Sequence, residues 1–177
     1  MPVIETHRLS LREISIGDAE FIFALMNEPA YHEFIGDRGV RTPENARTYI
    51  LEKLAPSYAK FGYGLYLVEL KGEKTPVGIC GFVKRDALEH PDIGFAFLRE
   101  HWSRGFASEA ARAALDYGFA ALAMKTVLGV TMPANRASIR LLERLGLRYQ
   151  GMTRVPPNDR DSMLFSTEGG PGRAAPS

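Results

Sequence analysis

Hydrophobic and polar positions change their spacing near the middle of the chain. Every position from 93 to 98 is apolar or small, which is typical of a strand covered on both faces. Between positions 106 and 122 apolar residues recur every three or four positions in an alanine-rich segment without proline, and this spacing predicts a helix. These apolar residues are Ala111, Ala114, Leu115, Phe119 and Leu122. The predicted centre of the fold is therefore a buried strand, a short turn at Gly105 and a long helix.

The chain before this centre contains three further predicted strands. Apolar and polar residues alternate at 8–13, as in a strand with one exposed face at the edge of a sheet. The segments 65–70 and 77–84 are largely apolar, and the polar turn at 71–76 lies between them. A short polar turn between two such runs predicts an antiparallel hairpin.

Two helices are predicted between the first strand and the hairpin. Ser15 and Asp18 have the spacing of a helix-opening cap, and Thr42 followed by Pro43 is a stronger start signal. The segment 27–41 between these helices shows no clear periodicity, and we interpret it as a loop. It either lines a substrate pocket, as functional loops on a rigid scaffold often do, or simply connects the two helices.

The chain after the central helix predicts a strand, a helix and two more strands. The strand covers 126–131, Asn135 lies where a helix cap belongs, and Gly146 lies where that helix stops. The segments 147–155 and 161–166 then predict a closing pair of strands.

This order of elements indicates an α/β or α+β fold with a mixed, mostly antiparallel sheet flanked by helices. The crossover helix makes the strands at 93–98 and 126–131 parallel to each other. We expect one domain at 1–167. The segment 168–177, rich in glycine, proline and small residues, predicts a flexible tail.

The turn at Gly105 is a candidate anion site. A helix that begins directly after a turn directs unpaired backbone N–H groups, and the positive end of its dipole, toward one point, and phosphate binds readily at such a point. Gly105 allows a ligand to approach the backbone, Ala107 keeps the next position small, and Arg104 adds a positive charge. The alternative is that Gly105 only permits a turn and Ser108 only caps a helix.

Composition narrows the class of protein. The 177 residues carry a formal net charge of +1 without a concentrated basic run, which weighs against a nucleic-acid surface. We expect no membrane span and no signal peptide, and we expect a cytoplasmic protein. The single cysteine, Cys80, lies in an apolar run and predicts a buried small side chain rather than a disulfide within the chain. The histidines lack ligand-like spacing, so we expect no metal. They are His7, His32, His90 and His101.

Three segments together carry a family resemblance. They are Thr6, His7, Arg8, Leu9, Ser10, Leu11 and Arg12; the residues 102–109; and Asn135, Ser138, Leu141, Leu142, Leu145 and Gly146. In order and spacing they resemble the GNAT superfamily of acetyl-CoA-dependent N-acetyltransferases, and within it the ribosomal-protein alanine N-acetyltransferase-like branch. The superfamily's loop pattern is Gln or Arg, two residues, Gly, one residue, then Gly or Ala. Gly105 and Ala107 fill the small positions, whereas Trp102 replaces Gln or Arg, a departure that leaves the backbone cradle intact.

The resemblance implies a sheet that splays between the strands at 93–98 and 126–131, with the pantetheine arm of acetyl-CoA in the gap. The backbone of Phe97 and Leu98 would pair with this arm, and Asn135 would bind it too. The pyrophosphate would be held by the N–H groups of Arg104, Gly105, Phe106, Ala107 and Ser108.

The implied chemistry is direct attack of a neutral amine on the thioester, without a covalent acyl-enzyme. Such a reaction needs a group that takes a proton from the amine and one that gives a proton to the leaving thiolate. Asp92 is the candidate base, because the branch often carries a carboxylate at this point; otherwise Asp92 only ends the preceding turn. Ser138 is the candidate acid, since the matching serine of the branch lies near the cofactor sulfur, and Tyr149 competes with it.

The acceptor implied by the resemblance is a primary amine, either a protein N-terminus or a small molecule, and the protein would be a monomer or a homodimer. From another class, a non-catalytic acyl-CoA-binding or sensing domain would keep the phosphate cradle and lack working proton-transfer groups. A nucleotide-binding protein with the same loop is disfavoured, because no Lys-Ser or Lys-Thr pair follows the glycine.

Overall fold

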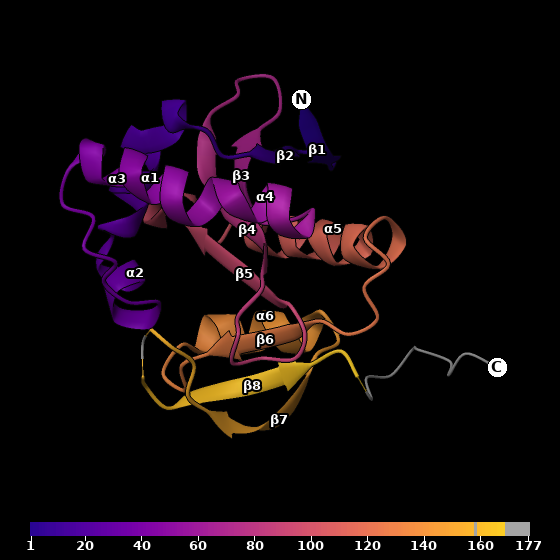
Figure 1. Ribbon diagram of the computed structural model, residues 1–177. Coiled ribbons are helices and arrows are strands. Elements are labelled where there is room, and N and C mark those ends of the chain that lie inside the picture. The colour runs from indigo at the N-terminus through magenta and orange to yellow at the C-terminus, as the bar shows by residue number, and fades with distance from the viewer. Residues whose placement is uncertain (158, 169–177) are drawn as a thin grey trace.

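The computed structural model describes residues 1–157 and 159–168 (Figure 1). Its strands are β1 (Pro2–Glu5), β2 (Leu9–Glu13), β3 (Leu65–Leu70), β4 (Pro76–Val83), β5 (Asp92–Phe97), β6 (Leu128–Thr131), β7 (Arg148–Thr153) and β8 (Ser162–Ser166). Its α-helices are α1 (Ala19–Met26), α2 (Pro29–Phe34), α3 (Pro43–Tyr49), α4 (Ala55–Phe61), α5 (Phe106–Ala120) and α6 (Arg136–Arg144). Short helical segments cover Ile16–Asp18 (η1), Ile50–Leu54 (η2, a π-helical stretch) and Arg99–His101 (η3). Apart from Glu168, the predicted tail at 168–177 lies outside the described residues.

The strands form one mixed sheet in the order β1-β2-β3-β4-β5-β6-β8-β7. Among the described strands β5 and β6 are the one parallel pair, as the crossover helix α5 between them requires. This confirms the predicted fold class of a mostly antiparallel mixed sheet flanked by helices. In this parallel pair Asp92 lies opposite Leu128, and Ile93 lies opposite Gly129. Beyond these residues the two strands separate, as Figure 1 shows.

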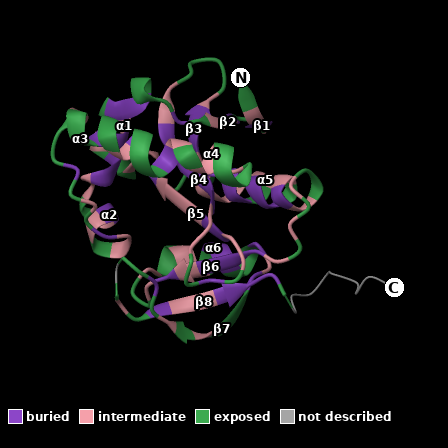
Figure 2. Ribbon diagram, in the orientation of Figure 1, coloured by how far each residue is buried: buried purple, intermediate pink, exposed green. Residues whose placement is uncertain are grey.

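Two helical layers cover the two faces of the sheet. Alternate strand residues face opposite layers, because side chains in a strand alternate in direction. Leu67 and Ile79 belong to a buried cluster with α1 and α3, whereas Val68 and Cys80 belong to a second one with α5. Figure 2 shows the buried residues concentrated where these helices face the sheet. Cys80 is buried, as predicted.

Capping residues and a glycine in the sequence predicted the ends of two helices correctly. Thr42 Oγ1 accepts a hydrogen bond from Asn45 N at 3.1 Å, so it caps α3 as predicted, with Pro43 at the first helical position. Asn135 Oδ1 accepts from Ser138 N at 3.2 Å and caps α6. Gly146, at φ 92°, lies in the left-handed region just after α6, which favours glycine.

Three expectations were wrong in part. The strand at 8–13 is not at the edge, because β1, which the sequence did not predict, pairs with β2 on its outer side. The segment 27–41 contains the helix α2, whose six residues are too few to show a periodic pattern. The strand at 93–98 is not covered on both faces, since Gly94, Phe95 and Ala96 are only half-buried and line a cavity.

Candidate functional site

A cavity of about 1590 Å³ lies where β5 and β6 separate. Its wall includes Phe95, Ala96 and Phe97 of β5, and Val130 and Thr131 of β6. The first residues of α5 and α6 and parts of α2 and the following loop also line it. The parallel strands thus provide a gap, and both following helices begin at its wall.

The turn before α5 has an unusual backbone. Ser103 (φ 62°) and Gly105 (φ 79°) both lie in the left-handed region, which a non-glycine residue such as Ser103 rarely adopts. Glu109 N donates to Gly105 O at 3.0 Å, so the N–H groups of residues 106–108 precede the first helical hydrogen bond. Residues 105–108 all line the cavity. The start of α5 therefore faces the cavity with unpaired N–H groups and the positive end of its dipole, which is an anion-binding arrangement.

A cluster of polar contacts from the β1–β2 turn holds this loop in place. Arg8 Nε contacts Glu109 Oε2 at 2.7 Å, and Arg8 Nη1 donates to Arg104 O at 2.8 Å. Thr6 Oγ1 donates to Glu109 Oε1 at 2.6 Å, and the Arg8 guanidinium lies 4.6 Å from the centre of the Phe106 ring. Burial alone would raise the pKa of Glu109, but the hydrogen bonds from Thr6 and Arg8 outweigh it and the pKa lies below its ordinary value. These contacts give the motif from Thr6 to Arg8 a physical role next to the anion site.

The backbone of β5 is only partly available to a ligand. Leu98 N donates to Val77 O at 3.0 Å, and Leu98 O accepts from His101 N at 2.9 Å, so the Leu98 N–H is used inside the protein, and pairing of Leu98 with a ligand stays a prediction. Because backbone groups two residues apart point to the same side of a strand, Phe95 and Phe97 face the gap instead. Phe97 O accepts from Trp102 Nε1 at 2.8 Å, which ties the loop to the end of β5. The Phe97 N–H and the backbone of Phe95 remain on the gap side.

The basic side chains near the anion site are not all those expected. Arg104 is exposed and is not among the cavity-lining residues; its carbonyl group contacts Arg8. Arg136, Arg140 and Arg144 of α6 do line the cavity, and sequence reasoning missed them. Their spacing of four residues, which places them on one helical face, was the available signal. Positive charge therefore comes from α6 rather than from the side chain of Arg104.

Two polar residues at the start of α6 also belong to this candidate site. Asn135 and Ser138 both line the cavity and are half-buried. The hydrogen bond from Ser138 N to Asn135 Oδ1 fixes the amide of Asn135. The structure therefore brings the predicted residues Asn135 and Ser138 together with the start of α5 around one cavity.

Asp92 is a buried carboxylate at the other end of β5. It is 2% exposed, lines the cavity and accepts a hydrogen bond from Arg85 Nε at 3.0 Å. Burial raises its pKa to about 6 even though Arg85 opposes the shift. At neutral pH this carboxylate is mostly ionised and is a stronger base than an exposed aspartate.

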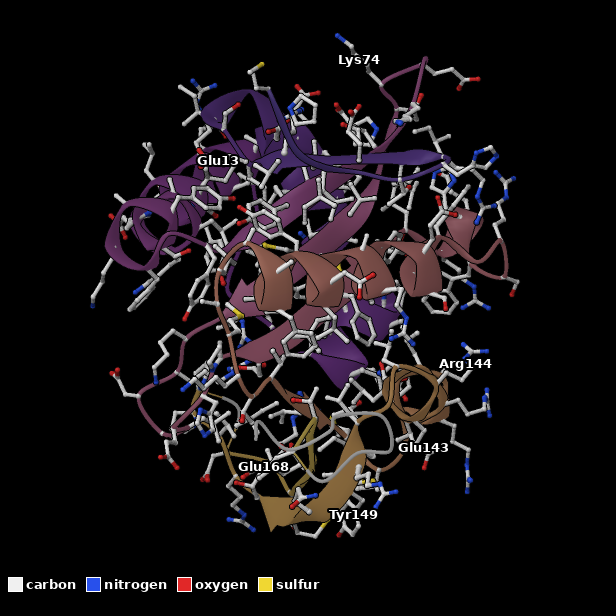
Figure 3. All side chains as sticks on the ribbon, turned by 90° about the vertical axis from the view of Figure 1, so that its right-hand side faces the viewer. Glu13, Lys74, Glu143, Arg144, Tyr149 and Glu168 are labelled. Carbon is white, nitrogen blue, oxygen red and sulfur yellow. The ribbon has the colours of Figure 1, made fainter. Side chains whose placement is uncertain are left out.

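Tyr149 does not share the cavity with these residues. It lies on β7, the edge strand, where its side chain is 51% exposed and its ring centre is 5.8 Å from that of Phe165. Figure 3 shows Tyr149 at the outer rim of the molecule. Tyr149 is not among the cavity-lining residues, and the geometry therefore favours Ser138 over Tyr149.

The lining of the cavity suits an anionic organic ligand. Within residues 1–157 and 159–168, no group of three or more His, Cys, Asp or Glu side chains could hold a metal ion. His101 Nδ1 is buried in the cavity wall beside Phe106 and has no hydrogen-bond partner among the described residues. Unpaired N–H groups at α5 and arginines on α6 fit a phosphate-bearing molecule. The described helices include none that is both long enough and apolar enough to cross a membrane.

Fold and cavity together define an α/β protein with a candidate anion-binding site in the gap between two splayed parallel strands. The family model described as the acetyltransferase (GNAT) domain matches residues 8–148. YoaA of Bacillus subtilis (strain 168), named as an uncharacterized N-acetyltransferase, is 33% identical over 154 residues, which are 86% of this chain and 86% of YoaA. The chain therefore belongs to the GNAT acetyltransferase family, and it is an N-acetyltransferase.

Solved structures agree with this assignment. A GNAT-family acetyltransferase from Bacillus anthracis has a TM-score of 0.76 and 26% identity, and the match covers 92% of this chain and 96% of that one. RimL, a ribosomal L7/L12 α-N-protein acetyltransferase in complex with coenzyme A, has a TM-score of 0.80 and covers 94% of this chain and 97% of its own. At 14% identity, RimL shows the shared fold alone.

Proposed function

We propose that this protein transfers the acetyl group of acetyl-CoA to a primary amine by direct attack within a ternary complex. The observation that carries the proposal is the start of α5, whose unpaired N–H groups open into the gap between β5 and β6. A diphosphate fits this cradle, and the gap beside β5 accepts an extended arm. GNAT enzymes use acetyl-CoA as the acetyl donor, and RimL binds coenzyme A on the same fold.

Residues of this chain have separate roles in holding the donor. The N–H groups of residues 105–108 bind the pyrophosphate, and the α6 arginines add positive charge nearby. The Phe97 N–H, the backbone of Phe95 and the side chain of Asn135 bind the pantetheine arm. Bound acetyl-CoA supplies an activated thioester, and the protein has to orient the amine and move two protons.

Asp92 and Ser138 are our candidates for the two proton transfers. Asp92, with its pKa raised to about 6, accepts a proton from the incoming ammonium group, directly or through water. Arg85 keeps the carboxylate oriented. The Ser138 hydroxyl donates to the leaving sulfur; its position at the start of α6, on the cavity wall, supports this role.

The acceptor is a protein N-terminus or a small-molecule amine. The opening motif, which resembles the first strand of the ribosomal-protein branch, supports this branch, and RimL, whose name gives a ribosomal protein as its substrate, shares the fold. We extend this substrate class to the present chain only as a proposal, and we propose a monomer or a homodimer.

The test measures free thiol released from acetyl-CoA in the presence of a panel of amines, together with acetyl-CoA affinity by calorimetry. Gly105→Glu should abolish acetyl-CoA binding, because it places a carboxylate and a side chain at a position with φ 79° against the pyrophosphate. Ser138→Ala should keep the affinity and lower turnover by about tenfold to a thousandfold. Unchanged affinity in Gly105→Glu would contradict the cradle, and unchanged turnover in Ser138→Ala would assign the acid role to water. Tight acetyl-CoA binding by the wild type without amine-dependent thiol release would indicate an acyl-CoA sensor.

A further inference from the structure

Three arginines of α6 follow one edge of the cavity. Arg136, Arg140 and Arg144 all line it, and they are spaced four residues apart within the helix Arg136–Arg144. Residues at this spacing lie on one face of a helix, about 6 Å apart along its axis. The three side chains therefore give the cavity wall a continuous basic face.

The described residues supply no counter-charge to the α6 arginines. Among these residues, no ion pair or hydrogen bond involves the guanidinium group of Arg136, Arg140 or Arg144. Glu143 is the one acidic residue of α6, and it is exposed and does not line the cavity. In the view of Figure 3, Arg144 lies on the side of α6 toward α5 and Glu143 on the opposite side. The basic face is therefore open to an anion that is not part of the described chain.

This arrangement of charge is unfavourable for the helix itself. Like charges four residues apart destabilise a helix, and α6 contains two such pairs, Arg136 with Arg140 and Arg140 with Arg144. The first turn contains no acidic residue, so Arg136 adds positive charge at the positive end of the helix dipole. An anion bound along this face removes the repulsion.

Arg112 of α5 fixes the end of α6 beside the start of α5. Its Nη2 donates to Arg144 O at 2.9 Å, and its Nη1 donates to Leu145 O at 3.4 Å. A cation is favourable at these carbonyl groups, because they lie at the negative end of the α6 dipole. Arg112 lies about 6 Å along α5 from Ser108, the last residue of the proposed pyrophosphate cradle. The C-terminal half of α6, with Arg140 and Arg144, is therefore the half held nearer to the cradle.

Acetyl-CoA has a second phosphate close to its pyrophosphate. The pyrophosphate is attached to the 5′ oxygen of the ribose, and the second phosphate is attached to the 3′ oxygen of the same ring. We propose that Arg140 and Arg144 bind this 3′-phosphate and select the complete cofactor over its dephospho form. This inference rests on the proposed function and assigns a further subsite for its donor. Arginine suits the role, because two N–H groups of one guanidinium can bind a phosphate together.

The experiment measures the affinity of the protein for coenzyme A and for dephospho-coenzyme A by calorimetry. The two ligands differ only in the 3′-phosphate. Coenzyme A should bind about tenfold or more tightly, as is usual for hydrogen bonds to a charged group. Because the arginines are exposed, the difference should shrink as the salt concentration rises. Equal affinity for the two ligands at low salt overturns the inference.

Variants test the assigned residues. Arg140→Gln and Arg144→Gln should each lower coenzyme A affinity by about fivefold and leave dephospho-coenzyme A affinity nearly unchanged. Arg148→Gln is the matched control, because it removes the same charge four residues after Arg144 from an exposed side chain that does not line the cavity. It should keep the wild-type ratio of the two affinities. Arg144→Glu should abolish the preference for coenzyme A, and retained binding of dephospho-coenzyme A shows that this variant is folded. An equal loss of affinity for both ligands overturns the assignment.

An acidic segment of a protein acceptor is the other anion that exposed arginines could bind. The variants would then lower kcat/KM for the acceptor and leave the ratio of the two coenzyme A affinities unchanged, which overturns the inference.

Failure of this inference is distinct from failure of the proposed function. Equal affinity for the two forms of coenzyme A overturns the subsite, while amine-dependent thiol release from acetyl-CoA upholds the transferase. If no amine releases thiol but coenzyme A binds more tightly than its dephospho form, the transferase fails and the subsite is upheld. If neither form binds, the cradle and the subsite fail together.

Discussion

At the scale of single residues, Asp92 combines a structural cost with a chemical use. Its carboxylate is almost fully buried, and Arg85 supplies one hydrogen bond at 3.0 Å. Burial without full compensation destabilises the charged form, so the pKa rises from 3.8 to about 6. A carboxylate with this pKa is ionised at neutral pH and still holds a proton more strongly than an exposed one does.

Turnover should follow the ionisation of Asp92. The value of kcat should fall as the pH drops below about 6, because the protonated carboxyl cannot accept a proton from the amine. Asp92→Asn should lower kcat by roughly a hundredfold to ten-thousandfold and should flatten this acid limb. Rate profiles from pH 5 to 9 with saturating acetyl-CoA would check both. An unchanged acid limb in the variant would assign the limb to another group.

The pH dependence of the free energy of unfolding tests the burial of Asp92 independently of catalysis. Between pH 3.8 and about 6 the folded protein binds more protons at Asp92 than the unfolded chain does. The contribution of Asp92 to the free energy of unfolding therefore falls as pH rises through this window, by roughly 3 kcal/mol in total. Urea unfolding at both ends of the window should show that Asp92→Asn gains stability relative to the wild type as pH rises. A constant difference between the two proteins would show that Asp92 is not desolvated in solution.

Some of the residues on the cavity wall could be predicted from the sequence and some could not. Asp92 and Ser138 were named from the resemblance to the acetyltransferase branch, and both lie on the cavity wall. The pairing of Asp92 with Arg85 depends on how the β4–β5 loop folds back, which no local pattern encodes. The internal hydrogen bonds of the Leu98 N–H and C=O join it to Val77 and His101, and no local pattern predicted them.

At the scale of elements, the turn and helix from Ser103 to Ala120 show how far local patterns reach. Helical spacing and a glycine predict where α5 begins, because both are properties of neighbouring residues. The contacts that hold this turn were not predictable, since Arg8 and Glu109 are 101 residues apart in the chain. The motif that begins at Thr6, which carried part of the family resemblance, thus has a physical role: Thr6 and Arg8 hold the loop before α5 in place.

Arg8→Gln should weaken acetyl-CoA binding without changing kcat at saturation. The substitution removes the ion pair with Glu109 and the hydrogen bond to Arg104 O. The loop therefore loses contacts that fix its conformation, but no group that contacts the ligand is removed. Because Arg8 is partly exposed, we expect a modest effect, about fivefold to tenfold in dissociation constant. Calorimetry measures the affinity and thiol release measures kcat. Arg47→Gln, on the exposed side of α3, is the control. A large fall in kcat with unchanged affinity would contradict a positioning role.

At the scale of the whole molecule, the sheet consists of two parts that meet at β5 and β6. The sequence predicted the parallel pair, because a helical crossover demands it. It did not predict that β8 lies between β6 and β7, since strand order depends on pairing between distant segments rather than on local pattern. It also missed β1, and with it the true edge of the sheet. The cavity itself is a consequence of this arrangement, because it exists only where the joined strands stop pairing.

The junction between the two parts depends on a residue without a side chain. Gly129 of β6 pairs with Ile93 of β5, and α6 packs directly over it. A Cβ atom at Gly129 would lie 2.7 Å from Leu142 Cδ2 and 3.2 Å from Leu147 Cδ2. Leu142 is 1% exposed and Leu147 is 2% exposed, so both side chains are closely packed, although Leu142 also lines the cavity. An added methyl group therefore has to displace the Leu142 side chain, and with it the packing of α6 on β6.

Gly129→Ala should lower the free energy of unfolding by about 1–3 kcal/mol, the usual cost of overpacking a core. It should also lower turnover, because α6 carries Ser138 on the cavity wall. Gly17→Ala is the control: its new Cβ would meet only Ser15 Oγ, at 3.6 Å, an ordinary contact. Urea unfolding and thiol release on both variants separate the outcomes. Loss of stability with full activity would mean that α6 keeps its place over the gap and the strain is absorbed elsewhere. Equal stability of the two variants would contradict the close packing at the junction.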